Sequence, residues 1–201
     1  MTTKEVKINN ADLMKLRELT GAGMMDCKAA LTEAKGNLKE AQDLIRKKGL
    51  DIAKKKSTRE VREGQIISYI HAGGKLGVLL EINCESDFVA KNETFQGFCR
   101  DIAMQVAAAH PLYVAPADIP VAELEKEKSV FADQVKGKPE AVQAKILEGK
   151  LSKRYEEICL LNQKFIKDDT KTVQDLLTEN IAKIGENIVI RRFVRFEVGG
   201  N

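Results

Sequence analysis

The fold of this chain is decided at residues 79–92, LLEINCESDFVAKN, where a strand-like run passes through an acidic turn into a helix. Before the turn, apolar residues take every second position, the period of a strand with one apolar face; they are Leu76, Val78, Leu80, Ile82 and Cys84. After it, Asn92 is a good N-cap for a helix with an apolar stripe at spacings of three and four. That stripe comprises Phe95, Phe98, Ile102, Val106 and Ala109, and the helix is expected to close before Pro111.

The turn itself is Ser86-Asp87-Phe88-Val89, two apolar residues behind an acid. Such residues either plug the protein's own core or form a wedge that is offered to a partner. Most large apolar side chains in loops fold back inward, so the residues alone favour the plug.

The composition is that of an ordinary globular protein with a highly charged surface. A chain of 201 residues allows one or two domains, with 43% hydrophobic and 31% charged residues. No run approaches the ~20 apolar residues of a membrane span, and the N-terminal MTTKE has no apolar signal core. We therefore expect a protein of the cytosol, or of its organellar equivalent, without membrane contact.

Basic residues are concentrated at the front of the chain. Residues 1–62 carry 15 Lys and Arg against 9 Asp and Glu, although the net charge of the whole chain is only +3. The cluster Lys54-Lys55-Lys56, with Arg59 and Arg62, could bind nucleic acid. It is short and has no aromatic neighbour for base stacking, so a solvated linker is favoured.

Residues 9–49 predict three short helices. Asn10 is expected to cap the first, which ends at Thr20-Gly21-Ala22-Gly23, and Asn37 the third, which ends before Gly49. Apolar stripes supply the expected core: Leu13, Leu16, Leu19, Cys27, Ala30, Leu31, Ala34, Leu38, Ala41, Leu44 and Ile45. About 45 residues bury little apolar surface, so this small bundle is plausible as a binding module.

The loop between the first two of these helices contains Gly21, Gly23, Met24 and Met25. Methionines beside flexible glycines can form an adaptable apolar surface that holds a partner's helix. They can equally fill the core of the bundle. The sequence leaves both readings open.

The remainder predicts an α+β core. A strand from Gly64 to His71 forms a hairpin with the strand at 76–84, and a closing strand spans 187–198. Helices from Val121 and from Pro139, joined at Gly137-Lys138-Pro139, predict a helical hairpin arm over about 121–160. The expected domains are 1–53, a three-helix domain; 54–62, a basic linker; and 63–201, the core with its arm and dimerisation surface.

No catalytic or metal-binding constellation is visible. His71 and His110 have no ligand partners at suitable spacing, and there is no phosphate-binding glycine loop or nucleophile elbow. Cys27, Cys84, Cys99 and Cys159 lack paired spacing, which predicts reduced, partly buried thiols. We therefore expect a protein that is not an enzyme and needs no cofactor; a redox enzyme based on Cys84 and Cys99 is the weakest alternative.

Three stretches resemble bacterial translation elongation factor Ts. They are residues 16–31, LRELTGAGMMDCKAAL; residues 81–92, EINCESDFVAKN; and the end of the chain, KIGEN at 183–187 with RRFVRFEVG at 191–199. Two long signatures in the right order make the resemblance specific, and with the similar end it spans nearly the whole chain.

The resemblance implies a guanine nucleotide exchange factor for the GTPase elongation factor Tu, with an N-terminal module like a ubiquitin-associated domain and an α+β core. It implies that the module, at Gly21, Gly23, Met24 and Met25, grips the GTPase. It also implies that Asp87 and Phe88, with Ser86 and Val89 completing the motif, intrude to disturb the Mg²⁺ and phosphate site. The family usually has threonine where this chain has Ser86, and the hydroxyl is retained.

This chain resembles the short members of the family, because the duplicated core half of longer relatives is absent. A homodimer and a two-plus-two assembly with the GTPase are therefore expected, with no direct contact to nucleic acid. The alternative from a different class is an RNA-binding or ribosome-associated module that uses the basic front end and the arm.

Overall fold

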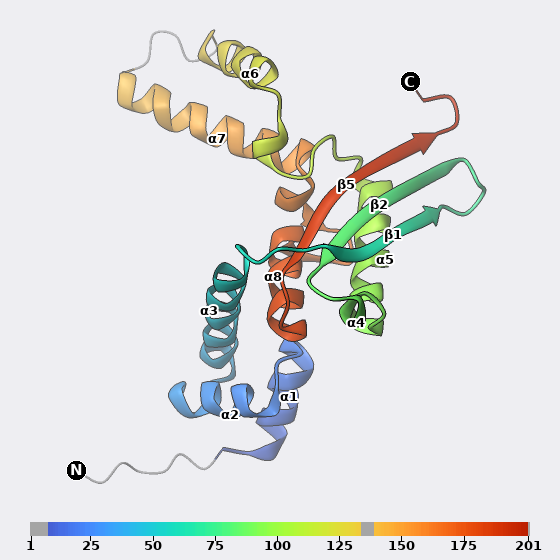
Figure 1. The fold of residues 1–201 in the computed structure, drawn as a ribbon. Coiled ribbons are helices and arrows are strands. Elements are labelled where there is room, and N and C mark those ends of the chain that lie inside the picture. The colour runs from blue at the N-terminus through green and yellow to red at the C-terminus, as the bar shows by residue number, and fades with distance from the viewer. Residues whose placement is uncertain (1–7, 134–138, 201) are drawn as a thin grey trace. The chain divides into compact units, whose positions relative to one another are not determined.

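A computed structural model describes residues 8–133 and 139–200, and Figure 1 shows its elements. In chain order they are α1 Asn10–Thr20, α2 Met24–Glu33, α3 Leu38–Lys56, β1 Glu63–Ile70, β2 Leu76–Cys84, α4 Asp87–Ala90, α5 Glu93–Ala109, α6 Val121–Asp133, α7 Glu140–Ile158, β3 Lys164–Phe165, β4 Asp168–Thr172, α8 Val173–Ile184 and β5 Ile188–Glu197, with single 3-10 turns at Pro116–Asp118 and Leu160–Asn162. The mixture of helices with small antiparallel sheets confirms the predicted α+β class.

The chain divides into two compact units, each of which combines segments that are far apart in the sequence. The first unit contains the chain up to Gly64, then Asn83–Gln96 and Leu177–Val189; the second contains Gln65–Ile82, Gly97–Leu176 and the chain from Ile190. The acidic turn and the connection from α8 to β5 thus belong to the same unit as the N-terminal helices. The sequential domain boundaries at 53 and 62 stay a prediction.

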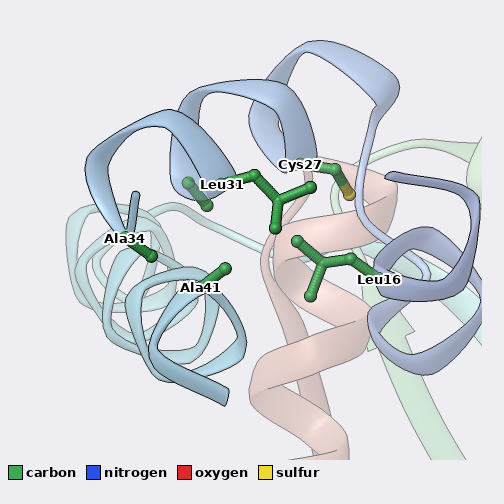
Figure 2. Close-up of a cluster of buried hydrophobic side chains, with 6 residues drawn as sticks. Leu16, Cys27, Leu31, Ala34 and Ala41 are labelled. Carbon is green, nitrogen blue, oxygen red and sulfur yellow. The ribbon is translucent and has the colours of Figure 1, made fainter. Parts of the chain in front are cut away.

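The three N-terminal helices enclose a small apolar cluster, shown in Figure 2. Its buried members are Leu16, Cys27, Ala30, Leu31, Ala34 and Ala41, all of them among the predicted core residues. Leu19, which was also predicted in this core, is 50% exposed. The cap of α1 is Asn9, one residue earlier than predicted, with its Oδ1 accepting from Ala11 N at 3.0 Å. The bundle is confirmed as three helices, and its likeness to a ubiquitin-associated domain stays a prediction.

Helix α3 is longer than predicted, because it continues through Gly49 to Lys56. Gly49 is buried, and a Cβ built there meets the Cβ of Ala182 in α8 at 3.6 Å. This glycine serves a close helix contact within the first unit, and packing overrides its weak helix propensity. Lys54, Lys55 and Lys56 therefore form the last turn of α3, where cations suit the helix dipole.

The central sheet has the order β1-β2-β5, with β1 and β2 forming the predicted hairpin. In the second unit, Val78, Leu80 and Ile82 are buried on one face of β2, as their alternation predicted. Helix α5 contributes further buried residues to this unit: Phe98, Cys99, Ile102, Ala103, Val106 and Ala107. The predicted strand and helix on either side of the acidic turn are thus confirmed as core elements.

The predicted arm consists of α6 and α7, which lie side by side (Figure 1). Arg154 Nε of α7 pairs with Glu127 Oε1 of α6 at 3.1 Å. At the base of the arm, Ile119, Ile158 and Cys159 form a second apolar cluster. Gly137 and Lys138, predicted as part of the hairpin turn, lie outside the described residues.

Candidate functional site

The acidic turn forms the single-turn helix α4 directly after β2. Ser86 has extended backbone (φ −127°), and its Oγ accepts from Val89 N at 3.4 Å, which makes it the N-cap. Asn92 then starts α5 by accepting from Thr94 N at 2.8 Å, so its predicted cap role is confirmed. Two caps within seven residues fix where each helix begins.

The structure separates the two apolar residues of the turn. Phe88 is 78% exposed, whereas Val89 and Ala90 are each 6% exposed. Successive residues of a helix point about 100° apart, so a single turn cannot bury all of them. The plug reading is therefore wrong for Phe88 and right for Val89: in this structure Val89 anchors the turn, and Phe88 is presented with Asp87.

Asp87 carries a negative charge beside the exposed ring of Phe88. Lys91 Nζ, one helical turn away, donates to Asp87 Oδ2 at 2.8 Å. That hydrogen bond and charge lower the pKa of the Asp87 carboxyl and raise the pKa of Lys91. Both side chains are mostly exposed, so the ion pair is weak and can open to a partner.

Behind the turn, Glu186 accepts three hydrogen bonds in the first unit. Its Oε2 accepts from Glu85 N at 3.1 Å and from Ser86 N at 3.0 Å, and its Oε1 accepts from Ser86 Oγ at 2.6 Å. The Glu85 carboxylate in turn accepts from Asn187 N at 2.6 Å and from Arg59 Nη1 at 3.3 Å. The Asn187 hydrogen bond is the main reason that the pKa of Glu85 is lowered.

Sequence reasoning missed Glu85, Glu186 and Asn187 as site residues. Glu186 and Ser86 lie 100 positions apart, so no local pattern connects them. The one available signal was the Gly185-Glu186-Asn187 run in the turn between a helix and a strand.

The second predicted site lies at the junction of α1 and α2. Gly21 ends α1 in the left-handed region (φ 65°), which glycine adopts readily, and Gly23 is the N-cap of α2. Met24 is 40% exposed and Met25 is 75% exposed. The buried cluster of the bundle is complete without them, so of the two open readings the structure supports an exposed apolar surface.

The cysteines offer no reactive centre. All four are buried, and burial raises the pKa of Cys84 and of Cys159 to about 11. A thiol that stays protonated is a poor nucleophile, which counts against the redox alternative. Among residues 8–133 and 139–200, no three His, Cys, Asp or Glu side chains gather into a possible metal site. In the same ranges, no helix is both long and apolar enough to cross a bilayer.

A third exposed surface lies on the central sheet, within the second unit. We call it the outer sheet face: Ile66, Ile70, Leu79, Phe196 and Val198, which are between 46% and 72% exposed. A shallow hollow of about 450 Å³ lies among Ile70, Leu79, Phe196 and Val198. In the closing strand β5, Ile188 and Ile190 are buried near its start, whereas Phe196 near its end is exposed.

Comparison with known proteins identifies relatives over almost the whole chain. The family model described as "Elongation factor TS" matches residues 3–200. The chain is 53% identical to elongation factor Ts of Geobacter sulfurreducens over 196 residues, covering 96% of this chain and 91% of that protein. It is 56% identical to elongation factor Ts of Moorella thermoacetica over 191 residues, covering 94% of each. It is also 56% identical to elongation factor Ts of Thermodesulfovibrio yellowstonii, covering 92% of each.

Proposed function

The chain belongs to the elongation factor Ts family of translation elongation factors, and from this premise we propose that it is the guanine nucleotide exchange factor of elongation factor Tu. It binds this GTPase and promotes release of GDP, in the cytoplasm where translation proceeds. The observation that carries the proposal is the exposed Phe88, held beside an ionised Asp87 on an anchored helical turn.

Asp87 and Phe88 are assigned the intruding role. GDP and Mg²⁺ are held by many charge-assisted contacts, with the metal bridging phosphate oxygens, so a small shift of the surroundings weakens the whole set. Burial of the Phe88 ring in the partner supplies about 1.5–3 kcal/mol towards such a shift. Asp87 brings a negative charge towards a site that binds phosphate and metal. Ser86 and Val89 hold the turn.

The N-terminal module is assigned the grip. Met24 and Met25 offer exposed, flexible side chains that adapt to an apolar partner surface. Gly21 and Gly23 set the backbone from which they project. Gripping and intruding residues belong to the same compact unit, which suits a factor that holds one domain while disturbing its nucleotide site.

No covalent bond is made or broken in this cycle. The factor and the nucleotide weaken each other's binding by the same ratio, because coupling between two binding sites is reciprocal. Incoming nucleotide therefore releases the factor, which can act again.

The test is the release of labelled GDP from elongation factor Tu. The wild-type chain is expected to accelerate release in proportion to its concentration until saturation. Leu112→Ala, which removes an exposed apolar side chain outside both sites, is expected to leave the rate unchanged. An unchanged rate with the wild-type chain would refute the proposal.

The alternative, an RNA-binding or ribosome-associated module, loses support from its own basic cluster. Lys56 Nζ donates to Gly185 O, Arg59 pairs with Glu85, and Arg62 pairs with Glu60 at 2.8 Å. Three of the five cations therefore have partners within the protein, although the pair of Arg62 with Glu60 is exposed and therefore weak. Salt-dependent RNA binding that disappears when Lys54, Lys55 and Lys56 are neutralised would favour this alternative.

The predicted homodimer is proposed to form through the outer sheet face. Large apolar side chains gather on this face, whereas exposed apolar residues of a monomer are normally scattered singly. Arg192 Nε and Glu81 Oε2 lie 2.7 Å apart on the same sheet, so this surface carries both charges and can meet a second copy without net repulsion. Sedimentation is expected to show a dimer that Phe196→Asp dissociates, and a strict monomer at micromolar concentration would refute this step.

A further inference from the structure

Two carboxylates join the α8–β5 connection to the residues before α4: Glu186 accepts from Glu85 N and from Ser86, and Glu85 accepts from Asn187 N. We propose that Glu186 is a positioning residue for nucleotide exchange, which sets the direction in which α4 presents Asp87 and Phe88. This inference rests on the proposed exchange function. In this proposal Glu186 contacts neither the nucleotide nor the GTPase and acts only through the turn.

The geometry connects the Glu186 carboxylate to the first turn of α4 through one hydroxyl. Ser86 Oγ donates to Glu186 Oε1 at 2.6 Å and accepts from Val89 N at 3.4 Å. Glu186 Oε2 meanwhile holds the successive amides of Glu85 and Ser86. Three donors on one carboxylate fix the backbone before α4. They also orient the Ser86 hydroxyl, whose oxygen caps α4 by accepting from Val89 N. Hydrogen bonds to an ionised acceptor are about twice as strong as neutral ones.

The α8–β5 connection is itself held in place. Glu85 accepts from Asn187 N, and Asn187 Nδ2 donates to Arg59 O at 2.9 Å, with Asn187 only 3% exposed. Lys56, at the end of α3, donates to Gly185 O. These contacts link the turn that presents Phe88 to the last helix of the gripping module.

A turn that is already ordered loses little conformational entropy when it inserts into a partner. Without Glu186, that entropy is lost during the exchange step, while the grip through Met24 and Met25 is unaffected. The maximal rate of GDP release should therefore fall, with little change in the factor concentration that gives half of it.

The test compares Glu186→Ala, Glu186→Gln, Ser86→Ala and Ser86→Thr with the matched control Glu156→Ala, which removes an exposed glutamate from α7. Glu186→Ala is expected to lower the maximal rate of GDP release about tenfold, as for loss of charge-assisted hydrogen bonds. Ser86→Ala should lower it less than Glu186→Ala does, and Ser86→Thr, which keeps the hydroxyl, should lower it less than Ser86→Ala does. Glu156→Ala should behave as wild type.

A double-mutant comparison separates positioning from general stability. If Glu186 acts through the turn, Phe88→Ala slows release much less in the Glu186→Ala background than in the wild type. Fully multiplicative effects, or a folded Glu186→Ala variant with the wild-type rate, would overturn the inference. If Glu186→Ala does not fold, Glu186→Gln and Ser86→Ala make the same comparison.

Amide exchange in the free protein supplies a readout that needs no GTPase. The amides of Glu85 and Ser86 are expected to lose protection in Glu186→Ala, and retained protection would contradict the proposed geometry. If the wild-type chain failed to accelerate GDP release while these amides behaved as expected, the exchange function would be refuted and the hydrogen bonding would stand.

Discussion

Phe88→Ala is the substitution that separates a wedge from a core residue. Full burial of a phenylalanine is worth about 1.5–3 kcal/mol. Because Phe88 is 78% exposed in the free protein, most of this, about 2 kcal/mol, remains available for binding a partner. At about 1.4 kcal/mol per factor of ten, the variant should promote GDP release about 30-fold less effectively. The free energy of unfolding should change by less than about 0.5 kcal/mol, as for other exposed positions.

The assay pairs stopped-flow release of a fluorescent GDP analogue with urea unfolding of the free factor. Phe95→Ala is the matched control, because Phe95 is a fully buried phenylalanine seven residues away. It should lower the free energy of unfolding by about 3–5 kcal/mol. A loss of this size for Phe88→Ala would show that Phe88 supports the core. A normal rate of GDP release with Phe88→Ala would show that Phe88 takes no part in nucleotide exchange.

Three further predictions concern stability, pH and grip. Gly49→Ala should raise the free energy of unfolding by about 0.5–1 kcal/mol, because alanine favours the helix and its Cβ meets Ala182 at an ordinary 3.6 Å. Gly49→Leu should lower it by about 1–3 kcal/mol, because the larger side chain overpacks the contact. Urea unfolding measures both changes. The lowered pKa of Glu85 stabilises the folded protein at pH values above the unfolded-state pKa of 4.5, and this stability is lost as the pH falls through the lower folded-state pKa. The difference in unfolding free energy between wild type and Glu85→Gln should therefore shrink below pH 4.5. A constant difference would contradict this. Met25→Ala should leave stability unchanged, since the side chain is 75% exposed, but should raise the factor concentration that gives half-maximal GDP release.

Local patterns predicted the elements well wherever a single face of a strand or helix met the core. The alternation through β2 and the stripe along α5 identify their buried residues because periodicity records burial directly. The same logic found the buried cluster of the N-terminal bundle. It failed at Gly49, which looks like a helix end in sequence but packs against a distant helix.

The candidate site was predictable only in part, because its support comes from a distant segment. Asp87 and Phe88 were predicted as the intruding pair from the resemblance, whereas Glu186 meets Ser86 only in the folded chain. Composition could not decide the orientation of Phe88 either, because the tendency of apolar residues to be buried is an average over many loops. Here Val89 and Ala90 satisfy it, which leaves Phe88 outside.

An exposed Phe88 is also what a reversible exchange factor requires. A ring that left its own core to enter a partner would lose its burial in one place before gaining it in the other, and little free energy would remain to displace nucleotide. A ring that is already in water gains its full burial on insertion, and gives back the same amount when incoming nucleotide expels the factor. The hydrogen bonds of Glu186 complete this requirement, since they hold the turn without covering the ring. The proposed function therefore depends both on the hydrogen bonds of Glu186 and on the exposed ring of Phe88. Loss of either should slow exchange while leaving the grip through Met24 and Met25 in place.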